Sequence, residues 1–147
     1  EEMGDQMLSR FDQADIIIMA AVVADYKSMD PKTSKIKKKE KDKDLSILMT
    51  QNPDILKLHG KKKTKGQFLV GFAAETDDLE KNALLKMEKK NLDMIAANIV
   101  GSSDSGFKAD TNKVKLFFKD GSSFDIPLME KDKVADILID QVIEKME

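Results

Sequence analysis

The feature that most constrains the fold is a continuous apolar run, Ile16–Ala24, which follows directly after Asp15. An apolar run without alternation is typical of a strand that is covered on both faces, as in a parallel sheet. We therefore expect a central strand over Ile16–Val23. The run is well short of the roughly 18 apolar residues that a membrane-spanning helix needs, so we expect a soluble protein without a membrane partner.

The remaining elements follow from apolar spacing, capping residues and turn chemistry. Four helices are predicted, at residues 1–13, 53–58, 77–91 and 131–145, with Thr76 as the cap of the third. Three further strands are predicted, at residues 45–49, 68–72 and 92–98. A hairpin is predicted at 113–126, because Asp120-Gly121 is a favourable turn. Strands that alternate with helices, followed by a late hairpin, predict a single α/β domain with a Rossmann-like, mostly parallel sheet flanked by helices.

Composition excludes several functional classes. The 25 Lys and Arg residues nearly balance the 27 Asp and Glu residues, and the net charge of -2 argues against a nucleic-acid partner. The absence of cysteine excludes disulfides, thiolate zinc sites and cysteine nucleophiles, and it fits a reducing compartment. The single histidine, His59, excludes poly-histidine metal centres and argues against a Ser-His-Asp triad. The common GxGxxG and GxxxxGK[ST] nucleotide motifs are also absent.

Four stretches fall where such a sheet binds ligands, beyond the carboxyl ends of its strands. They are residues 20–27, 35–39, 52–56 and 71–76. Small residues such as Ala20 and Ala21 let a ligand approach the backbone, and the helix start at Pro53 offers N–H groups to anions. Residues 27–44 are dominated by charged and polar side chains, so we expect them to form a mobile, lysine-rich flap.

Each of these features also has an ordinary structural explanation. Lysine runs are more often solvated loops than phosphate clamps. Asn52-Pro53-Asp54 alone is a helix start, and Lys86 with Lys90, one turn apart, could simply complement a helix C-terminus. His59 is expected at the surface or at a helix end. The order of the motifs along the chain, rather than any single motif, therefore carries the functional interpretation.

Six motifs in this order closely resemble the phosphopantothenate-cysteine ligase family. They are Ala20-Ala21-Val22-Val23-Ala24-Asp25-Tyr26-Lys27, Lys35-Ile36-Lys37-Lys38, Asn52-Pro53-Asp54-Ile55-Leu56, Gly71-Phe72-Ala73-Ala74-Glu75-Thr76, Ala97-Asn98 and Gly106-Phe107-Lys108-Ala109-Asp110-Thr111-Asn112. The resemblance runs from about the first predicted helix to the last. In bacteria the family is usually the C-terminal half of a bifunctional coenzyme A biosynthesis protein, so the resemblance implies a covalently linked decarboxylase domain.

The resemblance implies a reaction and its co-substrates. In this family the carboxylate of 4'-phosphopantothenate attacks the α-phosphorus of CTP to give an acyl-cytidylate, and the amine of cysteine then displaces CMP to form an amide. The resemblance further implies the use of Mg2+, a homodimer and a cytoplasmic enzyme. The predicted hairpin at 113–126 is our candidate for the dimer contact.

The resemblance also implies roles for individual residues. The catalytic residue is Lys35, the first lysine of the flap motif, which reaches the triphosphate or the reacting centre. The residues implied in nucleotide binding are Met19, Ala20, Ala21, Asp25, Lys35, Pro53, Asp54, Ile55, Leu56, Phe72, Lys86 and Lys90. The metal ligands are left open. Cationic side chains suit this chemistry, because the attack brings anions together and pyrophosphate departs.

The chain also departs from the family pattern. It contains neither the Gly-Gly-Thr motif nor the Asn-x-Ser-Ser-Gly stretch of the family's N-terminal part, whose asparagine handles the acyl-cytidylate. Ile99 stands where Asp usually follows Asn98, and Val22 stands where Ala is common. We therefore expect residues 1–147 to be a single ligase-type domain that lacks its N-terminal segment, binds nucleotide and is not fully active alone.

Two alternatives remain open at the level of the sequence. The first is a non-catalytic nucleotide-binding or dimerisation module, which would bind CTP without releasing pyrophosphate. The second, more remote, is a fragment of a Rossmann-like oxidoreductase, which the missing glycine fingerprint disfavours.

Overall fold

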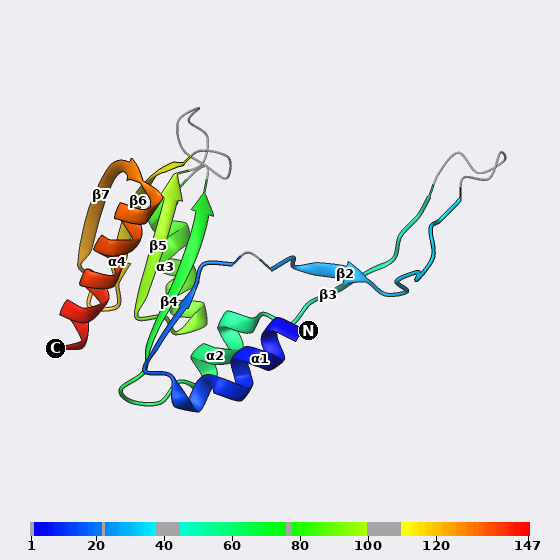
Figure 1. The fold of residues 1–147 in the computed structure, drawn as a ribbon, viewed down its shortest axis with the longest axis horizontal. Coiled ribbons are helices and arrows are strands. Elements are labelled where there is room, and N and C mark those ends of the chain that lie inside the picture. Colours follow the sequence, from blue (N-terminus) through cyan, green and yellow to red (C-terminus); the bar gives the residue numbers. More distant parts are fainter. Residues whose placement is uncertain (1, 22, 38–44, 76–77, 100–109) are drawn as a thin grey trace. The chain divides into compact units, whose positions relative to one another are not determined.

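The computed structural model describes residues 2–21, 23–37, 45–75, 78–99 and 110–147 (Figure 1). The chain forms two compact units: unit 1 comprises Glu1–Ala21 and Ile55–Glu147, and unit 2 comprises Val22–Asp54. Within the described ranges, no helix combines the length and the apolar character that crossing a membrane would require.

Unit 1 contains a five-stranded sheet in the order β1-β4-β5-β6-β7. Its strands are β1 (Ile16–Met19), β4 (Phe68–Glu75), β5 (Met94–Ile99), β6 (Thr111–Phe118) and β7 (Ser123–Glu130). The pairs β1/β4 and β4/β5 are parallel, whereas β5/β6 and β6/β7 are antiparallel. All strands except β6 therefore point the same way, which confirms the predicted Rossmann-like, mostly parallel α/β fold with a late hairpin.

The hairpin of β6 and β7 turns at Asp120-Gly121, as predicted. Gly121 has a positive φ of 86°, which glycine adopts without strain, and its N–H donates to the carbonyl oxygen of Phe118 at 3.0 Å. β7 forms one edge of the sheet and contains Pro127, which has no N–H to offer to another strand.

The described helices of unit 1 are α1 (Glu2–Arg10) with a 3-10 turn η1 (Phe11–Gln13), α2 (Ile55–Lys62), α3 (Leu79–Lys90) and α4 (Lys131–Met146). The prediction for the second of them was wrong at both ends, because Pro53 and Asp54 precede α2 and the helix continues to Lys62. Its buried side continues beyond the predicted end, as far as Gly60. α3 begins after Asp78, and Thr76, its expected cap, lies outside the described residues.

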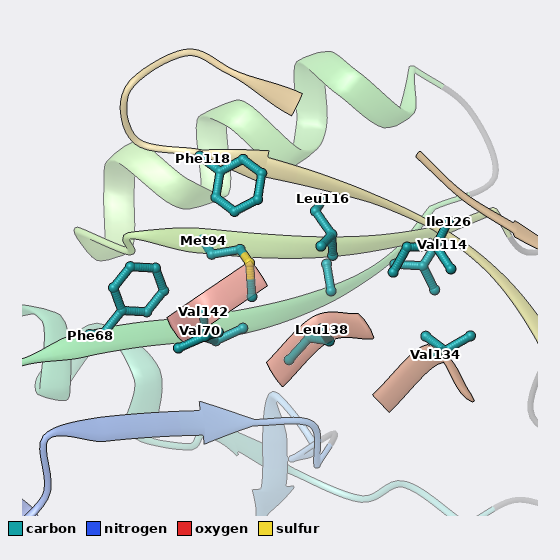
Figure 2. Packing of buried hydrophobic residues seen from close by; sticks show 11 residues of the cluster. Phe68, Val70, Met94, Val114, Leu116, Phe118, Ile126, Val134, Leu138 and Val142 are labelled. Atoms are coloured by element: carbon teal, nitrogen blue, oxygen red, sulfur yellow. The ribbon is translucent and has the colours of Figure 1, made fainter. Parts of the chain in front are cut away.

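One face of the sheet packs against α4 (Figure 2). The buried cluster on this face consists of Phe68, Val70, Met94, Ala96, Val114, Leu116, Phe118, Ile126, Val134, Leu138 and Val142. The three α4 members, Val134, Leu138 and Val142, recur every four residues and so form a stripe along one side of the helix. Removal of this apolar surface from water is a main stabilising term of unit 1.

The opposite face of β4 packs very closely against its neighbours. A Cβ atom at Gly71 would lie 2.7 Å from Leu92 Cδ1 and 2.9 Å from Leu56 Cδ2. A Cβ atom at Gly60, in α2, would lie only 1.7 Å from the carbonyl oxygen of Lys90, in α3. The two helices therefore meet backbone to backbone at Gly60, where no side chain fits.

Asp93 joins four segments at the amino end of the parallel strands. Its carboxylate accepts hydrogen bonds from Lys63 Nζ at 2.6 and 2.7 Å and from the backbone N–H of Leu69 at 2.8 Å. Its own backbone bonds to Leu69 O and to the N–H of Lys119, both at 2.9 Å. The Lys63 side chain is only 8% exposed, so this lysine is a buried cation that serves the fold.

His59 lies in the last turn of α2, which agrees with the expected helix end, but it is completely buried, with 0% exposure, so the expected surface position was wrong. Its Nδ1 lies 2.7 Å from the carbonyl oxygen of Ile55, and its ring meets the edge of the Phe11 ring at a centroid distance of 4.7 Å. The physical reason is the extension of α2 beyond Leu58. It places His59 one turn after buried Ile55, on the same side of the helix.

β1 also differs from the prediction. It ends at Met19, where its pairing with Gly71 stops, instead of continuing to Val23. Among the described strands its sole partner is β4, so it lies at an edge of the sheet rather than at its centre. A continuous apolar run indicates that both faces of a strand are covered. It does not indicate whether the strand has neighbours on one side or on both.

Unit 2 contains a short antiparallel pair, β2 (Tyr26–Ser28) and β3 (Met49–Gln51). β2 begins one residue before the predicted flap at 27–44 and overlaps its first two residues, and β3 begins only at the last residue of the strand predicted at 45–49. The bounds of these strands are set by their pairing, in which Tyr26 lies opposite Gln51 and Ser28 opposite Met49. Pairing between distant residues cannot be predicted from the local spacing of apolar residues. Residues 38–44 of the predicted flap and residues 106–109 of the last sequence motif lie outside the described residues.

The contact at Gly60 makes a testable prediction about stability. Replacing Gly60→Ala forces a methyl group into the Lys90 carbonyl, and we expect a loss of about 1–3 kcal/mol in unfolding free energy. Gly4→Ala is the matched control, because it is also a buried helical glycine but its Cβ would meet only the Ile55 side chain, at 3.3 Å. Urea denaturation measures both variants, and equal stabilities would contradict the backbone contact.

Candidate functional site

The carboxyl halves of β4 and β5 present an unusual group of side chains on one face of the sheet. Phe72 and Ala74 lie on the same side of β4 as Val70, which is buried against α4, yet Phe72 is 36% exposed and Ala74 is exposed. Asn98 of β5 pairs with Ala74 in the sheet register. A single aromatic ring beside small residues leaves a flat apolar surface that a planar ligand could contact.

Asn98 adds a polar group to this surface. Its side-chain Oδ1 is buried and has no hydrogen-bond partner among the described residues. A buried acceptor without a donor costs about 1–3 kcal/mol, so such a group marks a place where a ligand donor would be stabilising. Asn98 belongs to one of the sequence motifs but was not among the predicted binding residues. Its position on an apolar strand beside Ala97 was the feature that could have identified it.

Ala20 and Ala21 lie at the end of the neighbouring strand. They follow Met19, which is the last residue of β1 and lies opposite Gly71 of β4. Both alanines are exposed. The two predicted small side chains therefore lie just beyond the carboxyl end of β1, where they are accessible.

Met19, Ile55 and Leu56 have a different position from these residues. Met19 is 9% exposed, and Ile55 and Leu56 are each 6% exposed. Leu56 packs towards Gly71, and Ile55 packs towards Gly4 of α1. Their side chains belong to the core, so any contact of these three with a ligand has to come through their backbone atoms.

Lys86 and Lys90 lie one turn apart on α3, and both are half-buried. α3 covers the face of the sheet opposite to α4 (Figure 1), so it is also opposite to the side chain of Phe72. Lys90 is in the last turn of α3, beside the Gly60 contact. The structure therefore does not bring these two lysines to the surface around Phe72 and Asn98.

Unit 2 brings together predicted residues that are far apart in the sequence. The N–H of Asn52 donates to the carbonyl oxygen of Asp25, and Asn52 Nδ2 donates to that of Ala24, both at 2.8 Å. These two bonds hold Asp25 beside Asn52, the residue that precedes Pro53 and Asp54, and all three predicted residues are exposed. Asn52, expected to cap a helix, instead clamps the two motifs together.

Lys35 is exposed and lies outside any helix or strand of unit 2. Nearby, Lys32 forms an ion pair with Asp30. The predicted catalytic lysine is thus on an accessible segment, together with the exposed Lys37.

The described residues were also compared with the requirements of a metal site. They contain no cluster of three or more His, Asp or Glu side chains that could hold a metal ion. The protein side chains in the described ranges therefore do not build a resident metal centre.

Comparisons with known proteins identify the family of the chain. Residues 1–146 match the family described as the DNA/pantothenate metabolism flavoprotein C-terminal domain. The chain is 44% identical over 142 residues to the coenzyme A biosynthesis bifunctional protein CoaBC of Bacillus subtilis, which covers 96% of this chain and 34% of that protein. It is 37% identical over 145 residues to the corresponding protein of Escherichia coli K12, covering 98% of this chain and 36% of the relative. The chain thus spans about a third of the length of these relatives.

Solved structures show the same fold. The crystal structure of the C-terminal domain of a CoaBC protein superimposes with a TM-score of 0.75 at 30% identity, covering 96% of this chain and 59% of that one. A Cab2 variant in complex with phosphopantothenate-cysteine superimposes with a TM-score of 0.65 at 16% identity, covering 95% and 48%, and shows the fold alone. With a family match over almost its whole length, the chain belongs to the DNA/pantothenate metabolism flavoprotein C-terminal domain family.

Proposed function

We propose that this chain is the nucleotide-binding part of a phosphopantothenate-cysteine ligase that uses CTP. The observation that carries the proposal is the surface at the carboxyl ends of β4 and β5, where exposed Phe72 and Asn98, whose Oδ1 has no partner among the described residues, lie on the same face of two neighbouring strands. Phe72 offers a wall for a base, and Asn98 Oδ1 accepts a hydrogen bond from an amino or hydroxyl group of the ligand. Family membership and the bifunctional relatives support coenzyme A biosynthesis as the context.

The proposed reaction has two steps, and both balance without a redox partner. The carboxylate of 4'-phosphopantothenate forms a bond to the α-phosphorus of CTP as pyrophosphate leaves. The cysteine amine then attacks the acyl carbon, CMP leaves, and the amine loses a proton as the amide forms. The first step brings two anions together, so a positive charge near the triphosphate lowers its barrier.

Lys35 is the proposed source of that charge. Its side chain is exposed on an irregular segment of unit 2, which supports a role that begins when substrate is bound. Asp25, Pro53 and Asp54, held together by Asn52, are proposed as a second contact region for the nucleotide. Lys86 and Lys90 are also proposed to bind the nucleotide. Their helix covers the face of the sheet opposite to Phe72, so they would contact it from a different side.

Mg2+ enters the proposal as a companion of the triphosphate. The described residues contain no cluster that would hold it, so we derive no step through the metal. Phosphate oxygens and water are its usual ligands at nucleotide sites.

Full activity is proposed for a longer protein than these 147 residues. The curated relatives are about three times as long, and their bifunctional name supports a covalently linked decarboxylase activity. The alternative of a nucleotide-binding module without catalysis predicts CTP binding without pyrophosphate release.

Calorimetric titration of this chain with CTP and Mg2+ tests the binding surface, with ATP and GTP as comparison ligands. We expect selective binding of CTP, and we expect Phe72→Ala to weaken it by about tenfold or more, the usual effect of losing an aromatic wall beside a base. Phe124→Ala is the matched control, because Phe124 is also exposed, at 40%, but lies on β7, which β5 and β6 separate from β4. A folded chain that binds no CTP would place the site outside these residues.

The role of Lys35 is tested in the Bacillus subtilis protein with its matched region replaced by this chain. We expect Lys35→Ala to slow CTP-dependent pyrophosphate release by about a hundredfold or more, while CTP binding is largely kept. Lys37→Ala, an exposed lysine of the same segment, serves as the control and should leave release near the unaltered rate. Equal rates for the two variants would favour the non-catalytic module.

A homodimer is also part of the proposal, and the apolar side chains of unit 2 support it. Those exposed by about half or more are Tyr26, Met29, Ile36, Leu45, Ile47, Leu48 and Met49, and Leu48 reaches 71%. An accumulation of this kind is typical of a surface that a partner covers. A second copy of the chain is the proposed partner.

Sedimentation measures this association directly. We expect Leu48→Lys to raise the dimer dissociation constant by about tenfold or more. Ile143→Lys, on the exposed side of α4, is the control and should leave it unchanged. A dimer that persists in Leu48→Lys would instead point to the hairpin of β6 and β7 as the contact.

A further inference from the structure

Asn52 lies at one end of the antiparallel pair β2/β3, directly before the predicted Pro53-Asp54 motif (Figure 1). Its backbone N–H donates to the carbonyl oxygen of Asp25 at 2.8 Å and so adds one hydrogen bond to the end of the strand pairing. Its side-chain Nδ2 donates to the carbonyl oxygen of Ala24, also at 2.8 Å and across 28 positions of the sequence. One residue therefore joins two distant motifs through both its backbone and its side chain.

Unit 2 has few other contacts that could hold these motifs together. None of its described residues is buried, and Tyr26 and Met49 in the strand pair are 58% and 49% exposed. Beyond the three paired residues of each strand, the N–H of Met29 donates to the carbonyl oxygen of Leu48 at 3.0 Å. A short pair of strands without a core is only marginally stable. Loss of the side-chain bond of Asn52 is therefore expected to open this end of the pair in a substantial fraction of the molecules.

The end that Asn52 closes is the end that carries proposed nucleotide contacts. Asp25, Pro53 and Asp54 lie there, and all three are exposed. A ligand that requires both motifs in one arrangement binds only the closed fraction, so its apparent dissociation constant rises as that fraction falls. We infer that Asn52 is a positioning residue of the nucleotide site, because its side-chain bond to Ala24 holds the two motifs in the binding arrangement. This inference rests on the proposed function.

The hydrogen-bond donor of the Asn52 amide is the group on which the inference depends. A carbonyl oxygen only accepts, so Ala24 requires a donor from residue 52. Asn52→Asp keeps the shape of the side chain, but an ionised carboxylate has no donor. Asn52→Ala removes the donor without adding a charge. Gln51→Glu is the matched control, because it makes the same change of charge on the exposed side chain of the neighbouring residue.

Calorimetric titration with CTP and Mg2+ gives the first readout. We expect Asn52→Asp and Asn52→Ala each to raise the dissociation constant about tenfold, the upper effect of losing one ordinary hydrogen bond. Gln51→Glu should leave it within about twofold, because surface charges are screened by salt. An unchanged dissociation constant in Asn52→Ala overturns the inference. An equal rise in Asn52→Asp and Gln51→Glu, with none in Asn52→Ala, would mean that charge alone acts and also overturns it.

Amide hydrogen exchange without nucleotide separates positioning from direct contact with the ligand. We expect the amide of residue 52 to be protected in the unaltered chain and to exchange about tenfold faster in Asn52→Ala, after correction for the intrinsic rate. The melting temperature should be unchanged, because the buried cluster beneath α4 lies in unit 1. Equal exchange in the two chains, or no protection in the unaltered one, overturns the inference. A loss of affinity that sedimentation finds only where the variant has dissociated into monomers overturns it too.

Kinetics in the Bacillus subtilis protein with its matched region replaced by this chain give the last readout. We expect Asn52→Ala to raise the KM for CTP about tenfold and to keep kcat within about twofold, because Asn52 arranges contacts and does not touch the reacting atoms. A fall in kcat at unchanged KM overturns the inference. Failure of the proposed function looks different: the unaltered chain then binds no CTP and the unaltered chimera releases no pyrophosphate, and the inference falls with it. Equal CTP binding by all the variants overturns the inference alone.

Discussion

The carboxylate of Asp93 is the interaction on which the rest of unit 1 depends. It ties Lys63, at the end of α2, to the first residues of β4 and β5, and Lys63 Nζ also donates to the carbonyl oxygen of Asn91 at 3.0 Å. Asn91, in the left-handed conformation that ends α3, donates in turn to the carbonyl oxygen of Gly60 at 2.9 Å. The amino ends of the parallel strands are therefore fixed by polar contacts, which leaves their carboxyl ends free to carry small and exposed side chains.

Because the strands are fixed at their amino ends, the candidate site at their carboxyl ends can contain a polar atom without a hydrogen-bond partner. Asn98 lies at the carboxyl end of β5, and the register of β5 is already set by Asp93 at the other end and by Met94 and Ala96 in the core. The cost of the unpaired Oδ1 is therefore small beside the burial that fixes the strand. Phe72 is exposed for the same reason, because β4 is held by Phe68 and Val70, which are packed beneath α4.

The strands and helices that have a strong apolar pattern could be predicted from the sequence. The prediction failed where a contact between distant residues determines the structure. The β4 and β5 strands, α4 and the turn at Gly121 follow from local patterns. The clamp of Asn52 on Ala24 and Asp25, and the ion pair of Lys63 with Asp93, join residues about 30 positions apart and leave no periodic trace. Within the candidate site, small and aromatic residues could be predicted, whereas the burial of Met19, Ile55 and Leu56 depends on how helices pack.

The two edges of the sheet differ in how readily they can pair with a further strand. β7 carries Pro127, which interrupts the row of N–H groups that an incoming strand needs, so this side resists association with other chains. β1 carries no such protection and has Ile16, Ile17 and Ile18 in sequence. A sheet with one protected edge and one unprotected edge can add a strand only at the unprotected edge. While no strand covers the edge of β1, we expect aggregation of the isolated chain to begin there.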